Sequence, residues 1–586
     1  MSSKVSFFGK QVIIRTDSLY WKNPDKIFDS ELYTAMLHNY LLDLRNKDSD
    51  FIKIFPTSDL KEQERLSLLL MKTLSKYPRE DALKIKPELK SLLKDIYTTD
   101  QFVENFYNFW RKHERFLVTE SNDFENGNED IDKRPYRIFN DTIEQLNHLV
   151  RKIYRDIREN TTGEHPIIYR QVPAGCQVGV IATQKETLLP DKYNNLNKIK
   201  IIRQVLIEPP LIINPPNNKR KGVFKLVDSN PIEGFDFTDS EWLCFPAKVG
   251  ELVIYLYFHS FYTNIAISTA NLFELCTDED LKKRPDGIYA FGVTDEQVAK
   301  FAPDKTVYFE DTENGIMVGA IPIADEFGYF GYVKKMMLTL YNSIMIRRGR
   351  MPVHGAMTRI TMKNGKEANV IIFGDTGTGK SESLEAFRSL SADNLKDLKI
   401  IFDDMGSLEV TKDGKIKAFG TETGAFVRLD DLDAGYAFGN IDRSIIMSAH
   451  MVNARAVLPI TTLEDILYGY EPDYFLYANN YEEVTDGNYI SFFSTPEEAM
   501  KVFKEGKRMA KGTTNEKGLV GAYYANVFGP TQLMEAHEPI AEKTFKAMFK
   551  ANVKVGMIKT QLGIPGKEND GPKNAAQALF NLILKK

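Results

Sequence analysis

The chain has 586 residues, enough for roughly three or four domains of ordinary size. Hydrophobic residues make up 43% and charged residues 27%, as is usual for a globular protein that buries a sizeable core. The net charge of -5 gives no reason to expect nucleic acid as a partner.

The cysteines and the N-terminus indicate a cytoplasmic location. Cys176, Cys244 and Cys276 have spacings that suit neither a zinc site nor a disulfide framework, so we expect reduced thiols. The N-terminus lacks the long apolar core of a signal peptide, and no run approaches about 18 apolar residues. We therefore expect no membrane partner.

The first quarter of the chain reads as helical. Apolar residues recur at helical spacing from about residue 28 to 118, for example Tyr33, Leu37, Tyr40 and Leu44. The acidic stretch 119–132 is typical of a surface linker, and a further helix follows it. We expect a helical N-terminal region at residues 1–135, which could serve docking or oligomer contacts.

Residues 136–327 are expected to form a mixed α/β domain. Short β-type runs broken by Pro, Gly and Asn begin near Pro166. The segment 250–275, GELVIYLYFHSFYTNIAISTANLFEL, is interpreted as a buried helix. The basic group Lys219, Arg220 and Lys221 is interpreted as solvated surface.

The chemistry is expected in residues 328–586, around the stretch 368–385. An apolar run, 370–373, precedes the glycine-spaced loop 374–381 and then helix-forming residues, which is the phosphate-loop pattern G-x-x-x-x-G-K-[ST] in its proper context. Lys380 would reach the β- and γ-phosphates and Ser381 would hold Mg²⁺. The alternative is an ordinary glycine-rich turn. The predicted nucleotide-binding residues here are Gly374, Asp375, Thr376, Gly377, Thr378, Gly379, Lys380, Ser381 and Glu382.

Other candidates flank this loop. Lys334 and Lys335 lie upstream, followed by His354; alone, they could be solvated charge and a structural histidine. Downstream, the apolar run 398–402 leads directly into Asp403 and Asp404. An acidic pair at the carboxyl end of a strand after a phosphate loop is where a nucleotide's metal is held, although a helix N-cap or turn would look similar.

Taken in order, these pieces resemble the phosphoenolpyruvate carboxykinase family, from about residue 240 to the end. In that family a tyrosine, followed six positions later by the second lysine of a pair, precedes a histidine, the phosphate loop, a double aspartate and two arginine- or lysine-bearing segments. The matching positions here are Tyr329, Lys335, His354, Lys380, Asp404, Arg428 and Arg455. The segment GTTNEKGL, which contains Lys517, looks like the family's nucleotide loop.

The resemblance implies an α/β, carboxykinase-like two-lobed fold, with a P-loop nucleotide-binding C-terminal domain and an added helical N-terminal region. It implies ATP or another nucleoside triphosphate, Mg²⁺ on Ser381, and Mn²⁺ ligated by Lys335, His354 and Asp404. A lysine ligand must lose its proton from a reference pKa of about 10.4, which the metal and the charge of Lys334 would both favour. The implied catalytic residues are Tyr329, Lys334, Lys335, His354, Lys380, Asp403, Asp404 and Arg455. Arg428 and Lys517 would contact the nucleotide.

Three functions remain open. The first is a carboxykinase that converts oxaloacetate and ATP to phosphoenolpyruvate, CO₂ and ADP, or the reverse. The motifs GDTGTGKSES and PVHGAM also resemble the HPr kinase/phosphorylase family, which favours a kinase of a small hydroxyl compound or protein serine. In that case Asp403 or Asp404 would orient or deprotonate the acceptor. The third is an ATP-sensing regulatory protein.

Two features bear on the choice. The carboxykinase substrate loop, Gly-Arg-Ser-Pro-Lys, is missing, and Arg170 is a candidate for its arginine. The basic segment 503–518, which contains three glycines, is a candidate lid, with an ordinary surface loop as the alternative. The expected partners are a nucleotide and a small carboxylate or hydroxyl substrate, and the oligomeric state is open.

Overall fold

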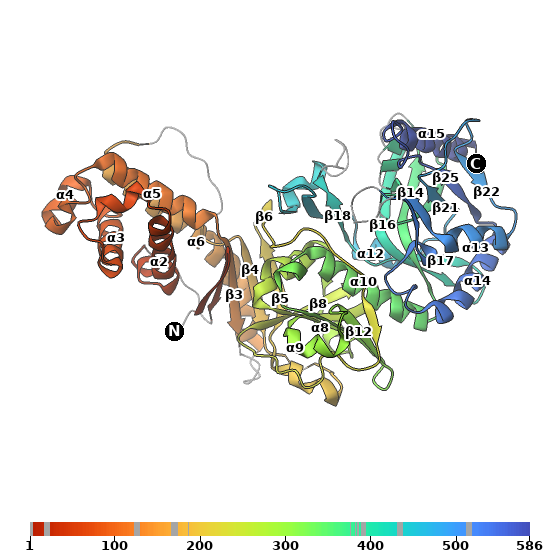
Figure 1. The fold of residues 1–586 in the computed structure, drawn as a ribbon, viewed down its shortest axis with the longest axis horizontal. Coiled ribbons are helices and arrows are strands. Elements are labelled where there is room, and N and C mark those ends of the chain that lie inside the picture. The colour runs from red at the N-terminus through yellow and green to blue at the C-terminus, as the bar shows by residue number, and fades with distance from the viewer. Residues whose placement is uncertain are drawn as a thin grey trace. The chain divides into compact units, whose positions relative to one another are not determined.

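The computed structural model describes most of the chain (Figure 1). The described residues are 4–16, 24–121, 129–165, 174–185, 187–375, 377–380, 382–383, 386–387, 394–429, 438–510 and 518–585. The chain divides into two compact units: unit 1 comprises Met1–Lys185 and Lys200–Glu208, and unit 2 comprises Glu186–Ile199 and Pro209–Lys586. Both contain helices and mixed sheets, so the expected α/β class is confirmed.

Unit 1 combines a helical layer with a sheet. Its helices are α1 (Pro24–Phe28), α2 (Glu31–Asn46), α3 (Leu60–Leu74), α4 (Arg79–Ile85), α5 (Ile96–Arg111) and α6 (Glu129–Thr162). Its strands are β1 (Lys4–Phe8), β2 (Gln11–Thr16), β3 (Glu114–Ser121), β4 (Val178–Thr183) and β5 (Ile201–Ile207), paired in that order. Side-chain caps begin three of the helices: Ser30, Asp59 and Asp95 accept the backbone N–H groups of the first turns of α2, α3 and α5.

This unit contains strands as well as the helices expected at residues 1–135. The apolar runs of β2 and β3 form adjacent parallel strands, and all six residues of β2 are buried. The unit also extends beyond residue 135, because α6 packs on α3 and α5, and β4 pairs with β3. Short strands among long helices were overlooked because a run of five or six residues carries little periodic signal.

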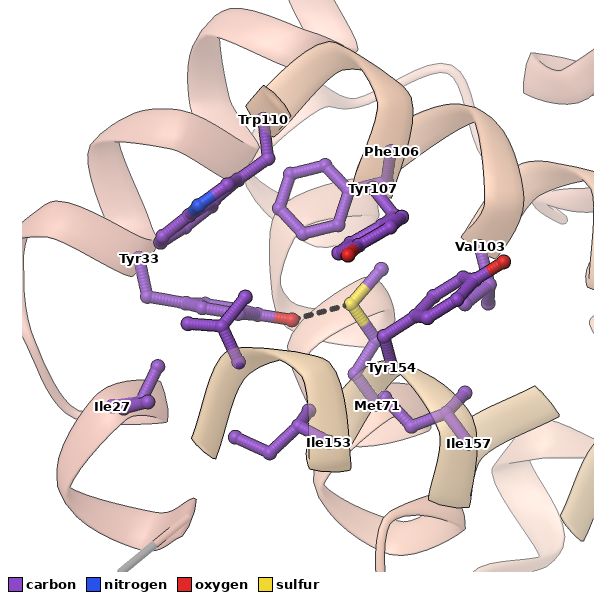
Figure 2. Close-up of a pocket in the computed structure, with 11 residues that line it drawn as sticks. Ile27, Tyr33, Met71, Val103, Phe106, Tyr107, Trp110, Ile153, Tyr154 and Ile157 are labelled. Atoms are coloured by element: carbon purple, nitrogen blue, oxygen red, sulfur yellow. Dashed lines mark hydrogen bonds between the residues drawn. The ribbon is translucent and has the colours of Figure 1, made fainter. Parts of the chain in front are cut away.

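The core of unit 1 is aromatic and contains one small cavity (Figure 2). Tyr33, Phe106 and Trp110 lie on its wall, and its volume is about 40 Å³. The Tyr33 hydroxyl donates to the Met71 sulfur at 2.6 Å beside it. The lining side chains are aliphatic, aromatic or thioether, so the cavity offers no charged group for chemistry.

Unit 2 contains two larger sheets and two small ones. Its helices are α7 (Thr263–Ile267), α8 (Asp278–Leu281), α9 (Asp295–Val298), α10 (Phe330–Arg347), α12 (Leu463–Leu467), α13 (Pro496–Glu505), α14 (Met534–Lys550) and α15 (Asp570–Lys585). The first sheet has the order β8-β9-β11-β13-β12-β7, with β10 (Glu274–Leu275) beside β8. These strands are β7 (Lys225–Val227), β8 (Trp242–Val249), β9 (Leu252–His259), β11 (Gly287–Val293), β12 (Val307–Asp311) and β13 (Ile316–Pro322).

The second sheet has the order β17-β16-β14-β15-β21-β25-β22. Its strands are β14 (Met351–Met362), β15 (Glu367–Phe373), β16 (Leu395–Val410), β17 (Ile416–Gly420), β21 (Tyr474–Asn479), β22 (Ile490–Phe492) and β25 (Lys554–Lys559). A small sheet pairs β18 (Gly424–Arg428), β20 (Arg455–Pro459), β19 (Ile445–Met447) and β6 (Leu211–Ile213), and a hairpin pairs β23 (Lys507–Met509) with β24 (Leu519–Gly521).

Strand β14 fixes the spacing of its two neighbours. Gly355 lies opposite Phe373 of β15 on one side and opposite Asp404 of β16 on the other. A Cβ atom at Gly355 would lie 2.6 Å from the Ile372 carbonyl oxygen, so this close approach requires glycine. The end of β15 and the acidic pair of β16 are therefore held one strand apart.

Helix α10 links the two larger sheets. It contacts β8, β11 and β13 of the first sheet and β14 and β16 of the second. Apart from Lys335 and Arg347 it is buried all round, as a helix between two sheets must be. Its first turns therefore bring Lys334 and Lys335 to the second sheet.

Two expectations in this unit were wrong. The segment 250–275 is not one buried helix. Its first part forms strand β9 (Leu252–His259), and the short helix α7 (Thr263–Ile267) follows. A fully buried strand and a buried helix have the same apolar pattern in the sequence. The β-branched and aromatic residues of LVIYLYFH favour the strand. Asp403 and Asp404 do not end a strand, because β16 continues through both to Val410.

Candidate active site

The glycine-rich loop 374–380 follows β15, as the sequence predicts. Gly377 and Gly379 have φ values of 78° and 92°, which suit glycine. Beyond the loop, Lys380, Glu382, Ser383, Ala386 and Phe387 are helical. The Lys380 ammonium lies inside the loop and donates to the carbonyl oxygens of Gly374 and Asp375 at 2.8 and 2.9 Å.

Neighbouring strands hold this loop in place. The Gly374 N–H donates to the His354 carbonyl at 2.9 Å, which ties the start of the loop to β14. The Asn480 side chain donates to the Gly377 carbonyl at 2.9 Å, and the Thr560 hydroxyl donates to the Thr378 carbonyl at 2.7 Å. On its other side, Arg508 of β23 donates to the Asp375 carboxylate at 2.8 Å. The hairpin at the base of the candidate lid is thus bonded to the loop.

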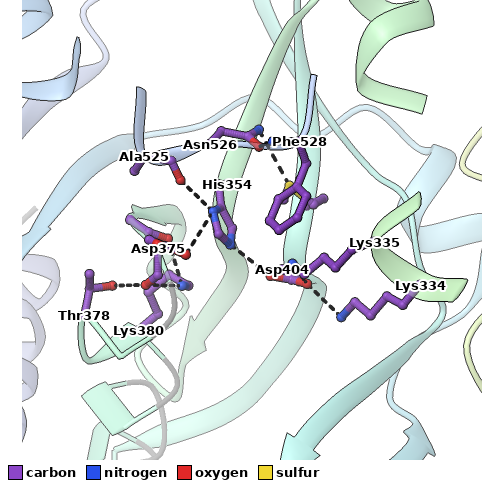
Figure 3. Close-up of polar contacts among 12 residues, drawn as sticks. Lys334, Lys335, His354, Asp375, Thr378, Lys380, Asp404, Ala525, Asn526 and Phe528 are labelled. Atoms are coloured by element: carbon purple, nitrogen blue, oxygen red, sulfur yellow. Dashed lines mark hydrogen bonds and ion pairs between the residues drawn. The ribbon is translucent and has the colours of Figure 1, made fainter. Parts of the chain in front are cut away.

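Beside the loop, a lysine, a histidine and an aspartate converge (Figure 3). His354 of β14 and Lys335 of α10 both face Asp404 of β16: Nε2 lies 3.1 Å from Oδ1, and Nζ lies 2.6 Å from Oδ2. Lys334 is also 2.7 Å from Asp404 Oδ2 and 2.9 Å from Glu422 Oε1. The predicted ligand trio Lys335, His354 and Asp404 is brought together here.

Burial and charge set the protonation of this cluster. Burial lowers the pKa of His354 and also that of Lys335. Burial alone would raise the pKa of Asp404, but the charges of Lys334 and Lys335 hold it well below its usual range. For Lys334 burial is outweighed by Asp404 and Glu422, so its pKa is raised. The cluster thus favours a charged Lys334, an ionised Asp404 and a neutral His354.

The contacts of His354 fix how its ring is oriented toward Asp404. Its Nδ1 lies 2.7 Å from the Ala525 carbonyl oxygen, which can only accept, so Nδ1 carries the hydrogen. A neutral ring then presents a bare Nε2 to Asp404 Oδ1, and two lone pairs face each other at 3.1 Å. Among the described residues no three His, Cys, Asp or Glu side chains form a metal group. Here the third donor would be Lys335, and two nitrogens with a carboxylate fit a transition metal.

A second group of predicted residues surrounds Phe426. Tyr329, which precedes the first turn of α10, has its ring 5.8 Å from that of Phe426. The Arg455 guanidinium lies 5.4 Å from the same ring. Arg428 and Arg455 are directly opposite in the β18–β20 pair. Two facing arginines are expected to repel each other unless an anion lies between or beside them.

Two residues that the sequence analysis did not assign to the site join it. Glu422, 2% exposed, is the second carboxylate on Lys334; it lies six residues before Arg428, but nothing in the sequence pattern paired it with a lysine. Arg220, expected to be solvated, lies 5.0 Å from the Phe528 ring, and Lys335 Nζ lies 4.6 Å from the same ring. The partner Phe528 is distant in sequence, so no local signal marked Arg220.

Several other expectations need a comment. Asp403 is partly buried, and burial raises its pKa to about 7. Four predicted site residues lie outside the described residues: Thr376, Ser381, Lys517 and Arg170. Residues 511–517 of the candidate lid 503–518 lie outside them too. Cys176, Cys244 and Cys276 are all buried, and none of the three is in a disulfide bond.

The described helices include none that combines the length and apolar character needed to cross a bilayer. No protein-family model matches the chain, and a search of curated proteins finds no match either.

Proposed function

We propose that the chain is a nucleotide-dependent phosphotransferase of the phosphoenolpyruvate carboxykinase type. The observation that carries the proposal is the cluster of Lys335, His354 and Asp404 beside the glycine-rich loop. The Gly374–His354 backbone bond joins the two parts directly. A phosphate loop alone fits many nucleotide-binding proteins, whereas a largely buried lysine next to a histidine and an aspartate is unusual for a simple kinase. A carboxykinase-like, two-lobed fold with a P-loop domain is part of the same proposal.

The residues of the cluster have separate roles in this proposal. Lys335, His354 and Asp404 would hold Mn²⁺, a Lewis acid that stabilises negative charge on an enolate or a transferring phosphoryl group. Lys334, held by Asp404 and Glu422, remains a fixed cation next to them. Mg²⁺ would accompany the nucleotide on the loop, where the Lys380 ammonium is available to its phosphates.

The arginines support an anionic acceptor. Arg455 Nε is buried without a hydrogen-bond partner among the described residues, and Arg428 faces it across the strand pair. Such a donor gains most from a carboxylate or phosphoryl oxygen. Arg220 is a better candidate than Arg170 for holding the carboxylate substrate, because it shares the Phe528 ring with Lys335.

An acceptor panel tests the proposal. Purified protein is incubated with ATP, Mg²⁺ and Mn²⁺ and with oxaloacetate, serine or HPr. We expect phosphoenolpyruvate and CO₂ from oxaloacetate, and a loss of at least about 100-fold in Lys335→Met and His354→Gln. Lys399→Met, at a partly exposed lysine of the same unit, is the matched control and should retain activity. Nucleotide binding without turnover on any acceptor would support an ATP sensor instead.

A metal titration tests the donor set without catalysis. The protein should bind Mn²⁺ in the absence of nucleotide, because the chain supplies all three ligands. Affinity should rise with pH, since Lys335 and His354 must be unprotonated to coordinate. Equal Mn²⁺ affinity in wild type, Lys335→Met and His354→Gln would refute this metal site.

A second function is favoured by Asp403. A partly buried carboxyl with a pKa of about 7 is suited to accept a proton from a hydroxyl acceptor near neutral pH. This would make the protein a kinase of a small hydroxyl compound or a protein serine. Phosphorylation of serine or HPr, abolished in Asp403→Asn, with no reaction of oxaloacetate would decide for the kinase.

A further inference from the structure

The chain reverses sharply at residues 523–526, next to His354, in a conformation that is costly for its residues. Tyr524 and Ala525 have φ values of 46° and 47°, so two consecutive residues other than glycine adopt the left-handed conformation. This is uncommon for any residue with a side chain, and more so for a bulky one. Such strain persists only where the surroundings enforce it, and it concentrates at functional sites.

The surroundings enforce this turn from two sides. The Tyr524 side chain is fully buried, with its ring centroid 5.0 Å from that of His537 and 6.3 Å from that of Phe545. On the other side lies Gly506, which ends α13. A Cβ atom there would be 2.0 Å from the Ala522 carbonyl oxygen and 2.5 Å from the Ala525 nitrogen. The turn is therefore clamped between a packed tyrosine and a glycine backbone.

The result of this conformation is the position of one carbonyl group. The Ala525 oxygen lies 2.7 Å from His354 Nδ1, as Figure 3 shows. Phe528, three residues on, places its ring 6.2 Å from the His354 ring and 4.6 Å from Lys335 Nζ. One short segment thus contacts two residues of the cluster.

We propose that the 523–526 turn is a positioning element for His354: the Ala525 carbonyl accepts the hydrogen bond from Nδ1 and so directs Nε2 toward Asp404. Gly506 acts through the turn, since only a residue without Cβ lets the turn approach. Histidines that bind metals are commonly oriented by such a partner on the other ring nitrogen, and losing it weakens metal binding about 10- to 100-fold. The effect of the turn on metal binding and catalysis rests on the proposed function. The position of the hydrogen on His354 Nδ1 does not depend on that function.

The test reads the hydrogen directly. Histidine is labelled with ¹⁵N, and long-range ¹H–¹⁵N spectra identify which nitrogens of each ring carry hydrogen; His354→Gln assigns the His354 signals by their loss. In the wild type we expect a hydrogen on Nδ1. Ala525→Gly, which keeps the carbonyl and removes the strain of a side chain at positive φ, should preserve this pattern and raise the thermal midpoint.

Gly506→Ala should disturb the pattern. The added methyl group must displace the turn, so His354 should lose hydrogen from Nδ1 in part or in full, and Mn²⁺ affinity of the nucleotide-free protein should fall about 10- to 100-fold. Gly414→Ala is the matched control: Gly414 has a φ of 80° and nothing within 4 Å of an added Cβ atom. It should leave both readouts unchanged.

The outcomes separate this inference from the proposed function. An Nδ1 without hydrogen in the wild type at pH 7.5 would overturn it even if Gly506→Ala did not fold. An unchanged pattern in a folded Gly506→Ala protein would overturn it as well. The expected pattern and shift in a protein that binds no Mn²⁺ and transfers no phosphoryl group would uphold the inference and refute the proposed function.

Discussion

Replacing Lys334 by methionine should destabilise unit 2 by about 3 kcal/mol. The Lys334 ammonium is 4% exposed and lies between two carboxylates, 2.7 Å from Asp404 and 2.9 Å from Glu422. Methionine has a similar volume but no charge. Asp404 would keep Lys335 as a counterion, but Glu422, itself 2% exposed, would lose its cation.

The magnitude follows from this uncompensated charge. Removing one partner of a buried ion pair costs about 3–5 kcal/mol, mostly because the other charge stays buried. We expect a loss at the lower end of this range. The Lys334 ammonium forms an ion pair with Glu422 Oε1, but the two groups are not aligned for a good hydrogen bond. Glu422→Gln leaves Lys334 paired with Asp404 and should cost less, about 1–2 kcal/mol. In the double variant the buried charge is gone, so the combined loss should fall short of the sum by about 1–2 kcal/mol.

Urea unfolding measures these differences. Trp242 is buried in unit 2, so replacing Trp21 and Trp110 by phenylalanine in every protein makes its fluorescence specific for that unit. Lys399→Met is the control, because Lys399 makes an ion pair with Asp465 at the same 2.9 Å but is 42% exposed. It should cost no more than about 1 kcal/mol. Equal losses for Lys334→Met and Lys399→Met, or additive losses in the double variant, would refute this reasoning.

Three further predictions concern other parts of the chain. Lys380→Ala should lower turnover by at least about 100-fold while circular dichroism stays unchanged; near wild-type turnover would exclude a phosphate-binding role for the loop. Burial lowers the pKa of His537 from 6.5 to about 4 in the folded protein. Below pH 6.5 the unfolded chain therefore binds a proton that the folded chain does not, and the free energy of unfolding falls by up to about 3 kcal/mol between pH 6.5 and pH 4. His537→Gln should flatten this decline in urea titrations at pH 7 and 4.5, and an unchanged decline would contradict the assignment. Val103→Ile should fill part of the 40 Å³ cavity and stabilise unit 1 by up to about 1 kcal/mol; a lower thermal midpoint would show that the cavity cannot take a methylene group.

The sequence predicted those parts of the fold whose signals are local. The amphipathic helices between residues 28 and 118 and the strand–loop–helix order around Lys380 are present. The strands β1 to β3 were missed, because five to eight residues are too few for a periodic pattern among long helices. β9 was mistaken for a helix because an element buried on all sides has no polar face to reveal its period.

Long-range contacts limited the prediction of the site. Lys335, His354 and Asp404 were found because they match a family motif, not because the sequence shows that three separate elements converge. Glu422 and Arg220 were not found, since their roles depend on Lys334 and Phe528, which are distant in sequence. The role of Ala525 could not be predicted from the sequence. It depends on the backbone carbonyl, which every residue has, and on a positive φ angle that an alanine does not indicate.

The register of β14 has a consequence for how this protein can fail. Because Gly355 is opposite both Phe373 and Asp404, one strand sets the distance between the loop and the cluster. A shift by one residue would turn His354 to the other face of the sheet and force a side chain into the place of Gly355. Misfolded molecules should therefore be inactive rather than slow. After partial denaturation and refolding, Vmax should follow the fraction of native molecules while KM stays constant.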